Sequence, residues 1–146
     1  MNKRTIGYWV VTALFAIPFL IGGVMDFLMT PEAVEIFSHL GYPAYFGKIL
    51  GVWKVLGALV VLAPGFPLLK EWAYAGMFFD LTGASISHAA SGDPVGQVLT
   101  PLVIAGLLIA SWKLRPPSRR LAMVSAAAQS DAAGPVQRIG SAQPAH

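Results

Sequence analysis

The sequence contains AYFGKILGVWKVLGALVVLA at residues 44–63, followed closely by EWAYAGMFFDLTGASISHAA at residues 71–90. Each stretch has the length of a membrane-spanning helix, which needs about 20 mostly apolar residues. Lys54 and Asp80 each lie in the middle of one stretch. A charge near the centre of a bilayer costs at least about 3 kcal/mol, so such residues face protein or water and mark candidate functional sites. The two stretches therefore predict a membrane bundle with a base and an acid inside it.

The composition also indicates a membrane protein. Of the 146 residues, 55% are hydrophobic and only 12% are charged, whereas a soluble domain carries about 25% charged residues. The chain has no cysteine, which excludes disulfides and thiolate metal sites. With this composition we expect the lipid bilayer as a partner. No basic stripe is interleaved with aromatic residues, so we expect no nucleic-acid partner.

Four apolar segments are long enough to cross a bilayer, at residues 6–29, 44–63, 71–90 and 95–113. Basic residues flank the first and last of them: Lys3, Arg4, Lys113, Arg115, Arg119 and Arg120. Lys and Arg accumulate on the cytoplasmic side of membrane proteins. We therefore expect an all-α membrane protein, an up-down bundle of four transmembrane helices in the cell inner (cytoplasmic) membrane, with both termini cytoplasmic.

The connections carry helix boundary signals. Thr30 can cap a helix, Pro31 suits its first position and Gly41 ends it, so a short interfacial helix is predicted between the first two spans. An ordinary loop is the alternative. Before the last span, Asp93 is the predicted cap and Pro94 the first helical residue.

The composition changes after Pro116, where the chain becomes rich in Ala, Ser, Gln and Pro and lacks aromatic residues. Such a segment buries too little apolar surface to fold alone. We expect residues 1–116 to form one membrane domain and residues 117–146 a disordered cytoplasmic tail.

Small residues share a helical face with each central charge. Around Asp80 they are Ala73, Gly76, Ala84 and Ser87, and on the side of Lys54 they are Gly47, Gly51 and Ala58. Small faces mark close helix contacts in membranes, so the two faces are predicted to oppose each other and to pair Lys54 with Asp80. The alternative is that such a pair only fixes the helix register.

Further polar residues are expected toward the outer half of the bundle. Asp26 and His88 are predicted to converge at one depth, above the Lys54–Asp80 level, while Thr82 and Ser87 add hydroxyl groups. There His88 would relay protons or bind a polar head group. A hydrogen-bonded interfacial histidine is the equally weighted alternative.

Other charged residues have simpler interpretations. Lys48 is expected to extend its ammonium to the interface. Lys70 falls in the cytoplasmic connection between the second and third segments, and Glu71 is interpreted as a solvated helix start.

Trp53 lies beside Lys54 in mid-helix, away from the interfacial belt that tryptophan usually occupies. It would line a pocket for a flat apolar molecule such as a quinone, although ordinary packing is an equal alternative. Nucleotide, zinc-protease and nucleophile motifs are missing from the sequence, and three scattered histidines predict no metal site. We expect no built-in cofactor.

Motifs within residues 40–93 resemble the central region of the DoxX-like membrane family. They are Gly41-Tyr42-Pro43, Gly51 with Lys54 and Gly57, Lys70 through Gly76, and Ser87-His88 with Gly92-Asp93. The resemblance extends over all four spans and implies a small four-helix integral membrane protein. Some relatives are subunits of quinone-linked sulfur oxidation or associate with oxidative-stress enzymes, and distant ones are chaperones for receptor assembly. Such a resemblance supports a fold more strongly than an activity.

Three functions are compatible with these features. The first is a redox-associated membrane subunit that binds a quinone-like molecule around Asp26, Lys54, Asp80 and His88, with electrons supplied by a redox partner. The second is a non-enzymatic helper in the assembly of another membrane protein. The third is a small proton-coupled transporter, for which a homo-oligomer would be suitable.

Overall fold

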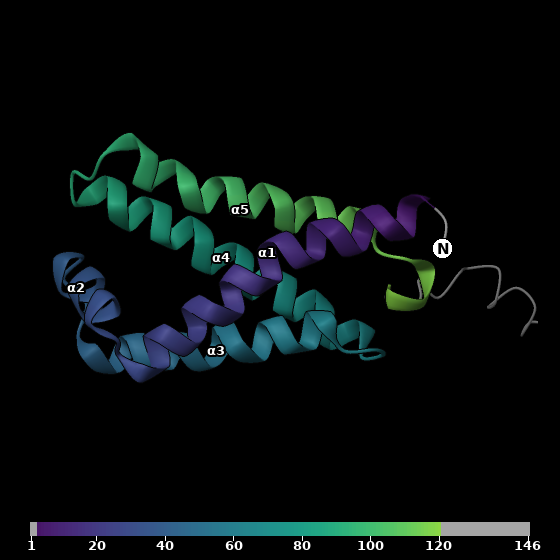
Figure 1. Cartoon of the computed structure of the whole chain (residues 1–146), viewed down its shortest axis with the longest axis horizontal. Helices are drawn as coiled ribbons and strands as arrows, with labels where there is room; N and C mark the ends of the chain where they lie inside the picture. Colours follow the sequence, from purple (N-terminus) through teal and green to yellow (C-terminus); the bar gives the residue numbers. More distant parts are fainter. Residues whose placement is uncertain (1–2, 121–146) are drawn as a thin grey trace, which may run out of the picture.

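The computed structural model describes residues 3–120, which are helical apart from short connections. Its elements are α1 (Lys3–Leu28), α2 (Pro31–His39), α3 (Ala44–Leu62), α4 (Pro67–Ala90), α5 (Val95–Leu114) and a short 3-10 helix (Pro117–Arg119). Figure 1 shows them in order of colour along the chain. Most of the expected tail, residues 121–146, lies outside the described residues.

The four long helices pack in a closed circuit, because α1 contacts α3 and α5, and α4 contacts the same two helices. Figure 1 shows α1 crossing between α3 and the α4–α5 pair. The centre is filled by buried side chains of all four helices, chiefly Phe15, Val61, Tyr74, Met77 and Leu108. This packing holds the middle of α3 close to α1 and α4, which positions the central charges.

Three helices, α1, α3 and α5, are long and apolar enough to cross a membrane. Their outer surfaces carry exposed apolar side chains such as Ile17, Leu59 and Val103, as expected for lipid-facing helices. Helix α4 has a similar length, but Lys70 and its other polar residues lower its mean hydropathy. It is therefore not among these three helices. The chain is thus a multi-pass helical membrane protein.

The predicted short helix after the first span is present as α2. The Thr30 hydroxyl oxygen accepts a hydrogen bond from the Ala33 amide at 3.4 Å, and Gly41 follows the helix at φ +78°. Ala33 and Phe37 are buried. Pro94 differs from its predicted place, because α5 begins at Val95 and Pro94 is the residue before it.

The small face of α3 packs differently from the prediction. A Cβ added to Gly51 would lie 2.5 Å from the Phe27 amide nitrogen and 2.6 Å from the Gly23 carbonyl oxygen. Small residues allow helix backbones to approach this closely. Gly51 therefore packs on α1, and Gly47 lies against Phe37 of α2. The predicted contact with a small face of α4 is wrong, because a Cβ on Gly76 would meet nothing within 4 Å.

Candidate functional site

Three charged side chains form an acid–base–acid triad in the middle of the bundle. The Lys54 ammonium donates a hydrogen bond to Asp26 Oδ2 at 2.8 Å and lies 3.8 Å from Asp80 Oδ2. The three residues come from α3, α1 and α4, so the triad joins three helices. The predicted Lys54–Asp80 pair is present, but it is the longer of two ion pairs.

The predicted convergence of Asp26 with His88 is not found. The close α1–α3 contact at Gly23 and Gly51 brings Asp26 within reach of Lys54. His88 instead bonds Asp93, through its Nδ1 atom, at 2.7 Å. The two residues therefore belong to different clusters.

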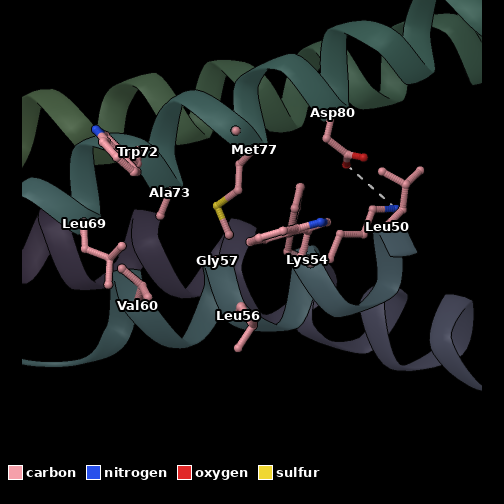
Figure 2. A pocket seen from close by; sticks show the side chains of 13 residues that line it. Leu50, Lys54, Leu56, Gly57, Val60, Leu69, Trp72, Ala73, Met77 and Asp80 are labelled. Atoms are coloured by element: carbon pink, nitrogen blue, oxygen red, sulfur yellow. Dashed lines mark ion pairs between the residues drawn. The ribbon is translucent and has the colours of Figure 1, made fainter. Parts of the chain in front are cut away.

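A pocket of about 530 Å³ opens between α3 and α4, beside the triad. Figure 2 shows Lys54 and Asp80 pointing toward each other at one end, and Trp72, Leu69 and Val60 toward the other. The rest of the lining is almost entirely apolar and includes Phe19, Leu50, Trp53, Leu56, Met77 and the small residues Gly57, Ala73 and Gly76. A Cβ on Gly76 would meet nothing within 4 Å, so this small residue of α4 leaves part of the space open.

Two tryptophans border the pocket and are exposed on the outside of the bundle. Trp53 is 67% exposed and Trp72 is 69% exposed, although both also line the pocket. In a membrane these exposed surfaces face lipid. The pocket therefore reaches the outer surface of the helices.

The two predicted hydroxyl residues lie outside the pocket lining. Thr82 donates to the Phe78 carbonyl oxygen at 2.8 Å, within its own helix. The Ser87 hydroxyl forms a hydrogen bond with the Tyr42 hydroxyl at 2.8 Å. This bond joins α4 to the connection between α2 and α3. Both side chains have structural partners.

Asp93 joins two histidines at the end of the bundle near α2. Its carboxylate oxygens lie 2.7 Å from His88 Nδ1 and 2.6 Å from His39 Nε2. These hydrogen bonds, that of His88 first, hold the pKa of Asp93 below its ordinary value. The bridge connects α2 with the α4–α5 turn, so the predicted helix-cap role of Asp93 is replaced by a tertiary contact.

This bridge predicts a pH-dependent contribution to stability. Because the pKa of Asp93 is lowered in the folded chain, the stabilisation is present above the ordinary aspartate pKa and is lost as pH falls through the folded value. Asp93→Asn should therefore lower the thermal stability near neutral pH, and the difference from wild type should vanish in strong acid. A pH series of melting curves measures this, with the exposed Glu35→Gln on α2 as control. A pH-independent difference would contradict the prediction.

At the opposite end of the bundle, two cations expected in the cytoplasmic connection and the C-terminal flank bind backbone carbonyl groups instead. Lys70 is fully buried, and its ammonium donates to the carbonyl oxygens of Val60, Val61 and Ala63. Arg119 donates to the Val61 carbonyl at 3.1 Å. Both cations therefore cover the last turn of α3, where carbonyl groups lack helical partners. The sequence signal for this contact is the position of Lys70 shortly after the end of α3, since basic residues near a helix C-terminus can bind its last carbonyl groups.

Glu71 also differs from its interpretation as a solvated residue. Its carboxylate accepts hydrogen bonds from Arg115 Nη2 at 2.6 Å and from Trp112 Nε1 at 2.8 Å. The Arg115 guanidinium also lies 4.8 Å from the Tyr74 ring centroid. These contacts join the beginning of α4 to the end of α5 and form a structural cluster away from the triad.

The chain matches the model of the DoxX-like family over residues 10–111. The matched range includes Asp26, Lys54 and Asp80 and the whole pocket lining. Searches of curated proteins and of solved structures give no match. Since the match covers more than half of the chain, this protein belongs to the DoxX-like family.

Proposed function

We propose that this protein binds a lipid-soluble molecule with a hydrogen-bonding head group, of the quinone type, in the pocket between α3 and α4. The observation that carries the proposal is an apolar pocket with Lys54 and Asp80 at one end. Its volume of about 530 Å³ lies in the usual range of ligand sites, roughly 300–1,000 Å³. The protein would act with a redox partner that supplies or removes electrons.

The lining suits such a ligand in two ways. A flat ring or apolar tail would pack against Trp53, Trp72 and Met77, which offer aromatic and adaptable surfaces. A carbonyl oxygen of the head group would accept a hydrogen bond from Lys54, whose ammonium has three donors. The site differs from the one predicted from sequence, since it lies toward the α3–α4 connection and does not include His88.

We also propose that α4 crosses the membrane, which makes four spans with both termini in the cytoplasm. Helix α4 has 24 residues, enough to span about 30 Å. Its charged residues Lys70, Glu71 and Asp80 all have ion-pair or hydrogen-bond partners inside the bundle. The exposed apolar side chains Phe79 and Ile86 cover its outer face. An internally satisfied helix of this kind is compatible with the bilayer.

This topology predicts the outcome of reporter fusions. Reporters placed after Lys3 and after Arg120 should both report the cytoplasm, because the basic flanks stay on that side. A reporter at Glu35 should report the opposite side. A fusion at Arg120 that reports the external side would contradict the four-span arrangement.

Filling the pocket tests the binding proposal directly. Gly76 lines the pocket and has space around it, so Gly76→Leu should weaken binding of a short-chain quinone analogue at least about tenfold, equivalent to 1.4 kcal/mol. Gly83→Leu is the matched control, since Gly83 is on the same helix, also has free space, and is absent from the pocket lining. Quenching of tryptophan fluorescence in purified protein measures the affinity.

The alternatives give different results in the same preparation. Saturable binding that Gly76→Leu weakens and Gly83→Leu preserves supports the proposal, and His88→Ala should also preserve it. Equal weakening by both leucine variants would contradict binding in this pocket. Absence of binding, together with stable co-purification of another membrane protein, would replace the proposal with the assembly-helper function.

A further inference from the structure

The triad contains two carboxylates and only one ammonium. Asp26, Lys54 and Asp80 have side chains that are 13%, 23% and 16% exposed, so water screens them little. If both acids were ionised, the cluster would carry an uncompensated negative charge. An unpaired charge inside a membrane protein is costly, and a carboxyl group in such surroundings binds a proton instead.

No other described cation is placed to neutralise this charge. In α5 the sole basic residue is Lys113, in the last turn of the helix. In α3 the other lysine is Lys48, which is exposed and has no ion pair among the described residues. In α1 the basic residues are Lys3 and Arg4, at the far end of the helix. In α4, Lys70 donates to carbonyl oxygens at the end of α3, and His88 bonds Asp93. The triad therefore lacks one positive charge.

The two acids of the triad differ in their distance from the Lys54 ammonium and in their position relative to the pocket. Asp26 has the closer ion pair, at 2.8 Å from the Lys54 ammonium, whereas Asp80 lies at 3.8 Å. Asp80 also lines the pocket and Asp26 does not. The less tightly paired acid thus faces the space in which a ligand would lie (Figure 2).

We propose that the triad holds one exchangeable proton, carried by Asp80, so that the pocket presents a carboxylic acid beside the Lys54 ammonium. The ligand class follows, and this part of the inference rests on the proposed function: a neutral head group with an exposed hydrogen-bond acceptor, such as a carbonyl oxygen, receives bonds from both groups. Binding of such a molecule is then linked to one proton.

Infrared spectroscopy of the full-length protein in lipid nanodiscs tests the protonation without any ligand. Wild type at neutral pH should show one carboxylic-acid C=O band, and the exposed Glu35→Gln control should keep it. Asp80→Asn should lose the band. Asp26→Asn should lose it too, because Asp80 then ionises against Lys54. Lys54→Met should about double the band, since both acids become neutral.

Glutamate variants then identify the proton carrier. Asp80→Glu should move the band and Asp26→Glu should leave it in place. A missing band in wild type, a band that survives Asp80→Asn, or a band that survives Asp26→Asn would each overturn the proposal. A circular dichroism spectrum of each variant confirms that the helices are retained before its band is interpreted.

The ligand part has a separate measurement. Affinity for the short-chain quinone analogue should fall about tenfold per pH unit once Asp80 loses its proton, while Asp80→Asn should bind independently of pH. If the affinity of the wild type for the analogue does not change with pH, the linkage between binding and the proton is overturned. If the analogue does not bind although the infrared results are as expected, the proposed ligand fails and the protonated triad stands.

Discussion

Replacing Lys54 with methionine is expected to lower the free energy of unfolding by about 3–5 kcal/mol, because it removes the ammonium that lies between two carboxylates. The remaining acids would face each other across α1 and α4 and would have to bind protons. The loss should therefore be smaller at acidic pH. Methionine keeps most of the apolar stem of lysine, so lost packing contributes little.

Unfolding of the purified protein in mixed detergents, followed by tryptophan fluorescence, measures this effect. Lys48→Met is the matched control, since Lys48 is on the same helix and exposed; it should change the stability by less than about 0.5 kcal/mol. Adding Asp26→Asn and Asp80→Asn to Lys54→Met should restore much of the stability. Adding only Asp80→Asn to Lys54→Met should restore less stability, because Asp26 would stay unpaired. Equal stabilities of Lys54→Met and Lys48→Met would show that the triad does not stabilise the fold.

Replacing Gly51 with alanine is expected to destabilise the bundle by about 1–3 kcal/mol, the usual cost of overpacking. The added Cβ would meet the backbone of α1, at 2.5 Å from the Phe27 nitrogen and 2.6 Å from the Gly23 oxygen. Backbone atoms cannot rotate away as a side chain can, so α1 and α3 must separate. This separation should also move Asp26 away from Lys54.

Gly83→Ala is the control for that change, because a Cβ on Gly83 would meet nothing within 4 Å. Its effect on the same unfolding curves should stay within about 0.5 kcal/mol. The Gly51→Leu variant, with a longer side chain, should lose more stability than Gly51→Ala. A Gly51→Ala protein as stable as Gly83→Ala would contradict the close helix contact.

The sequence was sufficient to predict the helices and the central charges, since both depend on hydropathy and local boundary signals. Lys54 and Asp80 stand out because each interrupts an apolar run, and the helix starting at Pro31 has a recognisable cap. The helix partners were harder to predict. Both α3 and α4 have small faces, and nothing in their spacing shows that Gly51 packs on α1.

The role of Asp26 could not be predicted for the same reason. Its contact with Lys54 depends on how closely α1 and α3 approach, which is a tertiary property. Lys70 was misplaced because a lysine beside a turn usually extends into water, whereas here unpaired carbonyl groups of α3 lie within its reach. A hydropathy profile records that lysine as polar but contains no information about the acceptors around it.

The two cations at the end of α3 imply an order of events during biosynthesis. Lys70 follows α3 closely and can cover the carbonyl groups of Val61 and Ala63 as soon as the next turn emerges. Arg119 reaches the Val61 carbonyl from 58 residues further along the chain. A nascent chain that has completed α4 therefore has the end of α3 only partly covered. The last contact can form only after α5 has been synthesised, which makes Arg119 a closing contact for a bundle whose long helices are already complete.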